Sequence, residues 1–482
     1  PRSTPIKSSA ASDVYKRQLQ ATGLIEEIRL ITTDATLESL PDCEILFVDM
    51  PYSSATLKAI ANAAKGEYTL LYTKETTLEM GMFALERMIH ILEDSSAGMV
   101  YADHYQIADG KQSNAPVIDY QFGSLRDDFN FGSLLLFNTE KLKEAAGHMK
   151  SDYNFAGLYD LRLKLSQHSN LVHINEYLYS EVENDTRKSG EKIFDYVDPK
   201  NRDRQIEMEQ ACTEHLKEIG GYLAPEFKKI EFSAGNFEYE ASVIIPVRNR
   251  IRTIRDAIKS VLMQKTDFKY NLIIIDNHST DGTTEAIDEF KDDERLIHIV
   301  PERNDLGIGG CWNVGVHHPK CGKFAVQLDS DDVYKDENTL AIMVRAFYEQ
   351  NCAMVVGTYM MTDFNMNMIA PGIIDHKEWT PANGRNNALR INGLGAPRAF
   401  YTPVLREVKV PNTSYGEDYA LGLNFSRQYQ IGRVYDVVYL CRRWDDNSDA
   451  SLDIVKMNGH NLYKDRIRTW ELQARIAMNK NK

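Results

Sequence analysis

The sequence predicts an α/β fold with two similar units in tandem, and three observations lead to this prediction. Short apolar runs alternate with amphipathic stretches from residue 241 onward, which is typical of strands and helices in a mainly parallel sheet. Polar or acidic residues follow these apolar runs, where open parallel sheets bind ligands. A weaker copy of the same pattern lies in the first half of the chain. With 482 residues, 43% of them hydrophobic, the chain can bury two cores.

The first two βα units of the second half are the clearest. Residues 241–247 form an apolar run that breaks at a proline into a polar turn, and apolar residues then recur at helical spacing over 254–262. A second apolar run, 271–275, ends in Asp276 and Asn277. The pattern predicts two strands, each followed by a helix, with polar side chains at the strand ends.

The next two strands carry the residues of greatest chemical interest. Residues 296–300 predict a third strand, followed by a glycine-rich loop that opens a short helical segment at 311–316. Residues 324–328 predict a fourth strand, which runs directly into the acidic stretch 329–332, Asp-Ser-Asp-Asp. Clustered carboxylates offer the hard oxygen ligands that Mg²⁺ or Mn²⁺ prefers beside a diphosphate. Taken alone, such a triplet is more often a solvated loop; its place after a buried strand favours a ligand site.

The ordered set of motifs resembles family 2 glycosyltransferases of the GT-A fold. That family has an Ile-Ile-Pro strand, an Asp-Asp or Asp-Asn turn, a glycine-rich segment with Asn, an Asp-x-Asp triplet and a later Glu-Asp pair. The last of these is present as Glu417-Asp418, at the start of a predicted helix. The resemblance covers about residues 239 to 455. It implies an inverting, metal-dependent enzyme that moves a sugar from a nucleotide donor to an acceptor hydroxyl in cell-surface glycan synthesis.

The resemblance also implies roles for individual residues. Asp418, next to Glu417, is the expected catalytic base, and Asp331 with Asp329 is expected to hold Mn²⁺ or Mg²⁺. Asn277 stands where many relatives have an acceptor-only Asp, so the nucleotide base stays open. Arg442 and Arg443 suit the diphosphate, although solvated arginines at a strand end are the alternative. The implied nucleotide-sugar-binding residues are Pro246, Val247, Arg248, Asp276, Asn277, Gly307, Asn313, Asp329, Arg442 and Arg443.

An internal repeat links the two halves. Residues 66–76 align without gaps with residues 322–332, and Asp160 is placed opposite Asp418. In the first copy Thr73-Lys74-Glu75 replaces the acidic triplet, which brings an ammonium group to the metal position. We predict two GT-A-like domains in tandem, Rossmann-like and with mainly parallel sheets, of which the first is degenerate and non-catalytic. A metal-independent transferase in the first copy is the alternative.

The expected boundaries follow from composition. Residues 1–20 are polar and aperiodic and are expected to be disordered or non-native, and the degenerate domain, truncated at its start, spans 21–182. A charged linker, 183–238, contains a predicted helix, and the catalytic domain spans 239–455. The tail, 456–482, predicts a polar helix that Leu462, Ile467 and Leu472 could dock on the catalytic domain.

Charge and cysteine usage limit the classes of partner. The net charge of −14 argues against a broad nucleic-acid interface. Six cysteines without a Cys-x-x-Cys pair, and no apolar run of eighteen residues, predict a cytoplasmic protein without a transmembrane segment. The expected partners are a nucleotide-sugar donor and a saccharide or lipid-linked saccharide acceptor, with peripheral membrane association left open. The rival hypotheses are a non-catalytic scaffold that binds sugar nucleotides or glycans and, third, a nucleotidyltransferase.

Overall fold

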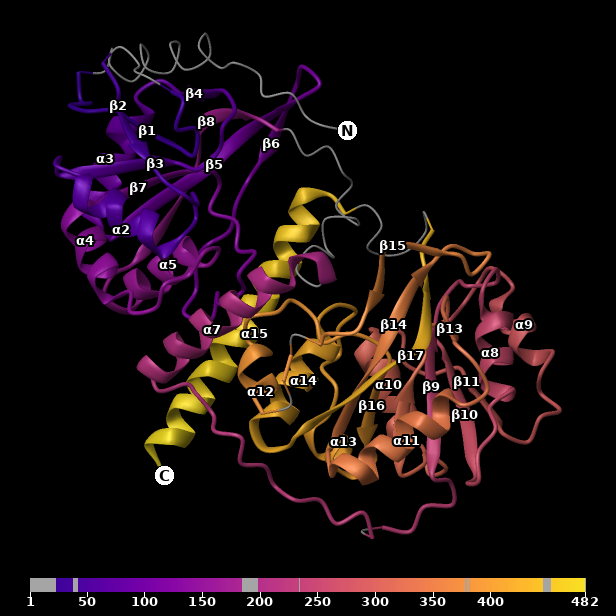
Figure 1. Cartoon of the computed structure of the whole chain (residues 1–482). Helices are drawn as coiled ribbons and strands as arrows, with labels where there is room; N and C mark the ends of the chain where they lie inside the picture. The colour runs from indigo at the N-terminus through magenta and orange to yellow at the C-terminus, as the bar shows by residue number, and fades with distance from the viewer. Residues whose placement is uncertain are drawn as a thin grey trace. The chain divides into compact units, whose positions relative to one another are not determined.

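The structure, a computed structural model, describes residues 23–37, 42–183, 198–233, 235–377, 379–380, 382–444 and 452–481. The predicted N-terminal segment 1–20 lies outside the described residues. The chain divides into two compact units, and each has its own sheet (Figure 1). The first unit comprises Pro1–Lys188, Ile206–Ile219 and Asp453–Asp465, and the second comprises Ser189–Gln205, Gly220–Leu452 and Arg466–Lys482.

The sheet of the second unit is mixed rather than mainly parallel. Its described strands follow the order β11-β10-β9-β12-β16-β14-β17-β13, with β15 paired to β14. Strands β9 to β12 are mutually parallel where they pair, whereas β16 runs antiparallel between β12 and β14. The alternation of strands and helices predicts a mainly parallel sheet, and β16 lies outside that alternation. The strands are β9 (Ala241–Val247), β10 (Tyr270–Asp276), β11 (Leu296–Ile299), β12 (Phe324–Gln327), β13 (Val333–Tyr334), β14 (Met354–Thr362), β15 (Met368–Ile374), β16 (Arg398–Tyr401) and β17 (Ile431–Arg442).

Helices cover this sheet because their apolar residues recur at helical spacing. In α8, for example, Ile254, Ile258 and Val261 are fully buried against the sheet, whose inner residues Ile244 and Ile274 are also fully buried. The helices are α8 (Ile254–Leu262), α9 (Thr283–Asp288), α10 (Ile308–His317), α11 (Thr339–Gln350), α12 (Gly384–Asn387), α13 (Thr402–Val408), α14 (Glu417–Gln428) and the later part of α15 (Ile454–Lys480). The α/β class predicted from the sequence is therefore confirmed.

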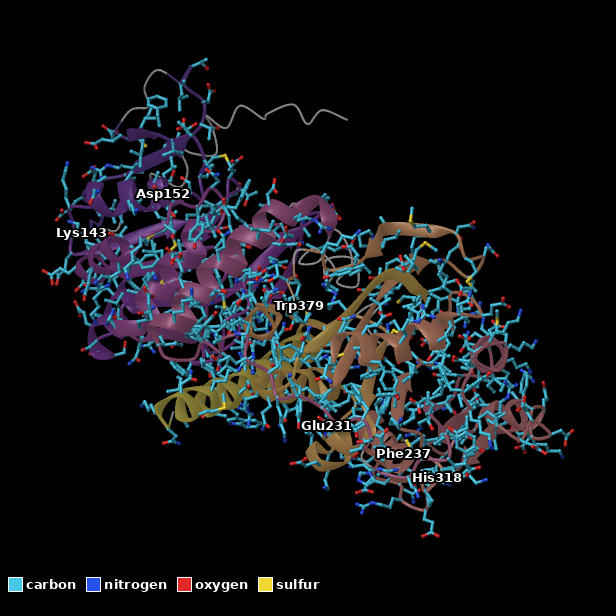
Figure 2. The ribbon with its side chains drawn as sticks, turned by 60° about the horizontal axis from the view of Figure 1, so that its bottom comes forward. Lys143, Asp152, Glu231, Phe237, His318 and Trp379 are labelled. Carbon is cyan, nitrogen blue, oxygen red and sulfur yellow. The ribbon has the colours of Figure 1, made fainter. Side chains whose placement is uncertain are left out.

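The segment that leads into β9 is held on this unit by an arginine. The Arg406 guanidinium lies 5.9 Å from the ring of Phe237 and donates to the carbonyl oxygens of Val316 and His318 at 2.8 and 3.3 Å. Phe237 and His318 lie near each other at one end of the unit (Figure 2). These contacts fix the start of the sheet at the end opposite to the carboxyl ends of its parallel strands.

The first unit has a smaller set of strands. Strands β1 and β2 form a parallel pair, and a second sheet has the order β3-β7-β5-β8-β4 with β6 paired to β5. Its described strands are β1 (Arg29–Thr32), β2 (Glu44–Phe47), β3 (Tyr68–Tyr72), β4 (Leu78–Met80), β5 (Met99–Ala108), β6 (Lys111–Ala115), β7 (Leu134–Asn138) and β8 (Leu171–Val182). Its helices are α2 (Ser54–Ala63), α3 (Ala84–Asp94), α4 (Thr139–His148), α5 (Gly157–His168) and most of α7 (Arg202–Glu218), which follows the short 3₁₀ turn η2 (Pro199–Asn201).

The two larger sheets repeat the same arrangement. The order β3-β7-β5-β8-β4 corresponds strand for strand to β12-β16-β14-β17-β13, and β6 corresponds to β15. Each parallel pair begins in the same way, Met99 opposite Leu171 and Met354 opposite Ile431. Helices α5 and α14 are both twelve residues long and directly precede β8 and β17. The tyrosines in the third positions of these helices, Tyr159 and Tyr419, both donate to a backbone carbonyl at 2.5 Å. The match is close enough to compare the sheets residue by residue.

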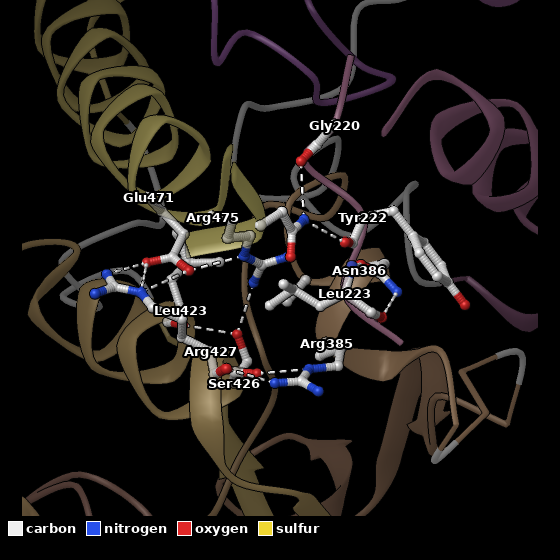
Figure 3. A network of polar contacts seen from close by, with 12 residues as sticks. Gly220, Tyr222, Leu223, Arg385, Asn386, Leu423, Ser426, Arg427, Glu471 and Arg475 are labelled. Carbon is white, nitrogen blue, oxygen red and sulfur yellow. Dashed lines mark hydrogen bonds and ion pairs between the residues drawn. The ribbon is translucent and has the colours of Figure 1, made fainter. Parts of the chain in front are cut away.

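The long helix α15 is anchored in each unit by a buried acid. In the first unit the Asp465 carboxylate accepts from Ser124 Oγ at 2.9 Å and lies 3.5 Å from Arg126 Nε. In the second unit Glu471 pairs with Arg427 at 2.5 Å and Arg475 at 2.7 Å (Figure 3). Leu462 packs against the core of the first unit, so the prediction that it docks the tail on the catalytic domain is wrong. Helical periodicity identifies a buried face but not the core that receives it.

Candidate active site

Three chain segments meet at one edge of the second sheet. Strand β12 ends at Gln327 and leads into the acidic stretch, while β16 runs antiparallel beside it and begins there with Arg398. The Nη1 of Arg398 lies 2.8 Å from Oδ2 of Asp418, the second residue of α14. The antiparallel strand thus brings an arginine, and through it the start of α14, to the carboxyl end of β12.

A glutamine connects this ion pair with the acidic stretch. The Nε2 of Gln327 donates to Oδ1 of Asp329 at 2.8 Å, and its Oε1 accepts the backbone N–H of Arg398 at 3.1 Å. The Arg398 guanidinium also donates to the carbonyl oxygen of Gly395 at 2.7 Å. Side chains and backbone therefore form a continuous chain of contacts from Asp329 through Gln327 and Arg398 to Asp418, which we call the polar relay.

The acidic stretch concentrates negative charge in a largely buried place. Burial raises the pKa of Asp329, and repulsion from Asp331 adds to the shift while Arg398 opposes it. Burial and repulsion from Asp331 and Asp329 hold the pKa of Asp332 well above its usual range. Asp331 has 17% of its side chain exposed, and its Oδ2 lies 3.9 Å from Arg250 Nε. Such crowding of carboxylates favours a cation at this point.

Arg442 has a structural role at the same edge. Its side chain is 1% exposed, its Nε donates to the carbonyl oxygen of Asp331 at 2.6 Å, and its Nη1 lies 2.8 Å from Asp256 Oδ2. Its backbone N–H donates to Asp332 Oδ1 at 2.7 Å. The residue that the resemblance assigns to the diphosphate thus fixes the backbone of the acidic turn.

Arg443 and two arginines not singled out from the sequence lie on the more open side. The backbone of Arg443 donates to Thr362, and its side chain is partly exposed. Arg250 faces Asp331, and the exposed Arg252 lies 5.0 Å from the ring of Trp444. Their signal in the sequence was the basic turn after β9, where only Arg248 was selected. Residues 445–448, which follow Trp444, lie outside the described residues.

The pair at the start of α14 has two unlike members. Asp418 is ion-paired with Arg398, and 28% of its side chain is exposed. Burial, and then repulsion from Asp418, raises the pKa of Glu417 to about 8, and its Oε2 is buried with no hydrogen-bond partner among the described residues. At neutral pH Asp418 is therefore the better placed of the two to accept a proton, because Glu417 retains its own.

The residues expected to face the nucleotide divide into two groups. Pro246 and Val247 end β9, Arg248 is exposed beyond them, and the backbone N–H of Asn277 donates to the Val247 carbonyl at 2.8 Å. Asp276 is fully buried instead. Burial raises its pKa, but hydrogen bonds from Ser279 and Thr284 outweigh this effect and hold the pKa below its usual range. Asp276 therefore stabilises the turn, and Asn277 is the side chain of the pair that can face a base.

Gly307 and Asn313 hold helix α10 against the loop ahead of α14. The Gly307 N–H donates to Asn412 Oδ1 at 2.8 Å, and a Cβ on Gly307 would lie 2.7 Å from the backbone of Thr413. The Asn313 amide donates to and accepts from the backbone of Val410 at 2.7 and 3.0 Å. Both polar atoms of Asn313 thus hold the backbone of Val410, which gives the residue a structural role.

The corresponding edge of the first unit has different residues. Counting along α5 and α14 from their matched ends places Leu158, not Asp160, opposite Asp418. The sequence alignment was therefore wrong by two residues, because it lacked the strand register that fixes the helix. Asp160 is buried, and burial raises its pKa to about 6. In the first sheet Leu71 lies directly opposite Leu135, the pair that matches Gln327 and Arg398.

Comparison with known proteins agrees with the geometry of the second unit. The profile of glycosyl transferase family 2 matches residues 242–399, which include β9 to β12 and the first three members of the polar relay. This part of the chain belongs to glycosyl transferase family 2. An uncharacterized glycosyltransferase of Rickettsia felis is 37% identical over 198 residues, 40% of this chain. The GalNAc(5)-diNAcBac-PP-undecaprenol beta-1,3-glucosyltransferase of Campylobacter jejuni is 36% identical over 93 residues, 19% of this chain.

These matches are partial. The aligned stretches span 31% of the Rickettsia glycosyltransferase and 29% of the Campylobacter one. The crystal structure of S. aureus TarS 1-349 in complex with UDP-GlcNAc is 20% identical and covers 49% of this chain and 72% of its own, with a TM-score of 0.38. Among the described residues, no helix combines the length and apolar character that crossing a membrane requires.

The acidic stretch suits a divalent cation in chemistry but not in ligand number. Carboxylates are the ligands that Mn²⁺ and Mg²⁺ prefer, and a cation would offset the repulsion that raises the pKa values of Asp329 and Asp332. However, no group of three or more His, Cys, Asp or Glu among the described side chains is arranged to hold a metal. The residues fit a cation whose remaining ligands come from a bound diphosphate and water.

Proposed function

We propose that the second unit is an inverting glycosyltransferase that uses a nucleotide-sugar donor. The observation that carries this proposal is the meeting of the acidic stretch, Arg398 and Asp418 at the carboxyl end of β12. The acidic stretch and Arg398 lie inside the segment 242–399 that matches glycosyl transferase family 2, and Asp418 follows it. This edge is where open α/β sheets bind nucleotides.

In the proposed reaction Asp418 is the base. It takes the proton of an acceptor hydroxyl while the hydroxyl oxygen attacks the anomeric carbon from the face opposite the leaving group. The bond between that carbon and the diphosphate oxygen breaks, and the nucleoside diphosphate leaves with the electron pair. One displacement of this kind inverts the anomeric configuration. Glu417, whose pKa is raised to about 8 by burial and by Asp418, stays protonated and adds no second charge to the base.

Asp331 and Asp329 would hold the divalent metal, with the donor supplying further oxygens. Bound there, Mn²⁺ or Mg²⁺ would stabilise the negative charge of the departing diphosphate as a Lewis acid. The exposed Arg248 and Arg252 and the half-buried Arg250 follow β9 at its carboxyl end and would attract the diphosphate.

Asn277 would read the base of the donor. Its Nδ2 donates to the carbonyl oxygen of Leu306 at 2.8 Å. The opposite amide orientation would put two acceptor oxygens face to face, so the Asn277 Oδ1 is the atom left for a ligand. An acceptor that faces the ring nitrogen of the Watson–Crick edge favours uracil, thymine and guanine, which carry a ring N–H there, over cytosine and adenine, whose ring nitrogen at that position is itself an acceptor.

We propose a saccharide or a lipid-linked saccharide as the acceptor. The Campylobacter relative, by its name, acts on an undecaprenyl-diphosphate-linked glycan, and its similarity to this chain supports a product that belongs to a cell-surface glycan. We also propose that the first unit is a degenerate copy without transferase activity, since leucines stand at the positions of Gln327, Arg398 and Asp418 and Lys74 lies in the segment that matches the acidic stretch.

The test is a donor screen with the full chain. UDP-, GDP- and dTDP-sugars with Mn²⁺ or Mg²⁺ would be assayed for binding and for slow donor hydrolysis by the wild type, Asp331→Ala and Asp418→Asn. We expect metal-dependent binding that Asp331→Ala abolishes, and turnover that Asp418→Asn abolishes while binding persists. Failure of every donor to bind, or binding that ignores both substitutions, would leave the non-catalytic scaffold as the better account.

A further inference from the structure

The polar relay contains two residues, Gln327 and Arg398, that no step of the proposed reaction uses directly. Gln327 is 4% exposed in an otherwise apolar strand, and the Arg398 side chain is 15% exposed. Desolvating an arginine and an amide costs stability unless their partners are well placed. A buried cation beside a candidate catalytic carboxylate therefore calls for an explanation.

Packing alone does not explain them, because the first unit builds the same strands without them. There Leu71 and Leu135 lie directly opposite each other in β3 and β7, at the positions of Gln327 and Arg398. Leu158 takes the position of Asp418 in α5. All three leucines belong to one hydrophobic cluster, in which Leu135 is 4% exposed. The strand order and register are thus compatible with an apolar core at this place.

The three polar residues are also replaced together. An arginine without Asp418, or Asp418 without its arginine, would leave a poorly compensated charge close to the core. The first unit has neither charge and no glutamine between the two positions. This joint replacement indicates that the members of the relay act as one device, which is either complete or absent.

We propose that Arg398 is a positioning residue that fixes the Asp418 carboxylate for proton abstraction, and that Gln327 fixes Arg398 relative to Asp329. The Nη1 of Arg398 holds Oδ2 of Asp418 at 2.8 Å and is itself held by the Gly395 carbonyl at 2.7 Å. Because the Asp418 Oδ1 accepts the backbone N–H of Tyr419 at 2.7 Å, the carboxylate is held at both oxygens. The geometry between the base and the donor-side carboxylate Asp329 is then set by protein contacts before either substrate binds.

This inference rests on the proposed transferase activity, and it is tested by comparing turnover with donor binding. Loss of a positioning residue should lower turnover and leave donor binding nearly intact, because Arg398 contacts the base side of the site. Loss of a donor-binding residue should weaken donor binding itself. The split between turnover and donor affinity separates these two outcomes.

The experiment uses the full chain and the residues that the first unit supplies. Arg398→Leu, Gln327→Leu, the double variant and Arg398→Lys would be compared for donor affinity, turnover of the donor identified by the screen, and thermal unfolding. We expect Arg398→Leu to lower turnover by about 100-fold with less than about a threefold change in donor affinity, as a base displaced by about 1 Å would. Arg398→Lys should regain at least about tenfold of that loss. The double variant should lose no more than Arg398→Leu alone, since both residues act through one contact.

Arg406→Leu is the matched control. Arg406 is a half-buried arginine of the same unit that donates to two backbone carbonyls and lies beside Phe237, at the opposite end of the strands. Its loss should lower the unfolding temperature without lowering turnover per folded molecule.

Two results would overturn the inference. If Arg398→Leu turns the donor over like the wild type, Arg398 does not position the base, although the transferase proposal stands. If Arg398→Leu and Arg406→Leu lose turnover only in proportion to unfolding, Arg398 is a structural residue. A wild type that binds and turns over no donor would overturn both the inference and the proposed function.

Discussion

Three positions at the same edge of two matching sheets are polar or charged in the second unit and leucine in the first. In the second unit a glutamine, an arginine and an aspartate lie in contact between the acidic stretch and α14. In the first unit the corresponding side chains are part of a hydrophobic cluster. Gln327, Arg398 and Asp418 correspond to Leu71, Leu135 and Leu158.

This difference separates what the fold needs from what the chemistry needs. The strand order β3-β7-β5-β8-β4 forms with leucines at these positions, so the charges of the second unit are not required for it. Other features are kept in both sheets, such as the tyrosines Tyr179 and Tyr439, whose hydroxyls each accept a backbone N–H at 2.9 and 3.2 Å. Features present in both units belong to the architecture, and features of the second unit alone are candidates for function.

The largest expected effect is on turnover. Asp418→Asn should lower turnover by about 1,000-fold, because an amide cannot accept the proton of the acceptor hydroxyl, and general bases contribute about 100- to 10,000-fold. Adding Leu158→Asp to that variant should restore nothing, since the first unit lacks the arginine and the acidic stretch that surround Asp418. Turnover at saturating donor is the measurement, and a regain of activity in the double variant would break the comparison.

The next effect concerns the stability of each unit. Asp465 is fully buried in the first unit beside Arg126, whose side chain is 4% exposed. Asp465→Ala removes the buried carboxylate that faces Arg126 and leaves that arginine paired only with the more exposed Asp128, 2.9 Å from its Nη1. It should cost about 3 kcal/mol, the low end for the loss of one partner of a buried pair. Hydrogen exchange of the full chain should show faster exchange in β5 and β7 and little change in β9 and β10.

Glu471→Ala is the matched variant for the second unit. It removes the partner of Arg427 and of the fully buried Arg475, so the expected pattern is reversed (Figure 3). If either variant speeds amide exchange equally in both units, the chain unfolds as one cooperative body. The two units would then not differ in how they lose stability.

Sequence patterns were sufficient for the class of fold and for most strands of the second unit. Runs such as 241–247 and 271–275 are apolar for the full length of a buried strand, and no other element competes for them. They did not reveal that β16 runs antiparallel, because the direction in which a strand pairs depends on contacts between distant parts of the chain, which a local pattern does not contain.

The same reason explains which site residues were missed. Asp329, Asp331 and Asp418 stand in short motifs and were selected directly. Gln327 has a weak signal as the polar residue of an apolar strand, and Arg398 stands in none of the motifs. Their relation depends on the pairing of β12 with β16, which joins residues 71 positions apart. Conversely, Asp276 and Asn313 belong to the family pattern, yet their polar atoms bond within the protein.

A smaller effect should appear in the choice of nucleotide. If Asn277 Oδ1 accepts the ring N–H of the base, then UDP, dTDP and GDP should bind at least about tenfold more tightly than CDP and ADP. A tenfold difference in affinity corresponds to about one hydrogen bond. Asn277→Asp should keep this preference, and Asn277→Ala should reduce it. Titration calorimetry would also give the stoichiometry. One nucleotide per chain is expected, and two would contradict the assignment of the first unit as a non-binding copy.

The smallest expected effect is a pH dependence of stability that the first unit should show and the second should not. His173 of β8 corresponds to Arg433 of β17, and its two nitrogens bond Asp103 at 2.8 Å and Asp119 at 2.9 Å. Burial lowers the pKa of His173, but the two carboxylates outweigh burial and raise the pKa above its ordinary value of 6.5. A raised pKa in the folded state stabilises the first unit below about pH 6.5, and this contribution disappears as the pH rises through the folded pKa.

Because 79% of the Asp119 side chain is exposed, the expected contribution is only about 0.5 to 1 kcal/mol. It would be measured as protection of β8 amides in the full chain between pH 5.5 and 8.5, after correction for intrinsic exchange. His173→Gln should remove the pH dependence, and β17, where Arg433 does not titrate in this range, is the internal control. If the protection of β8 and β17 depends equally on pH, the effect comes from a group that both units share. His173 would then not be the cause of the pH dependence in the first unit.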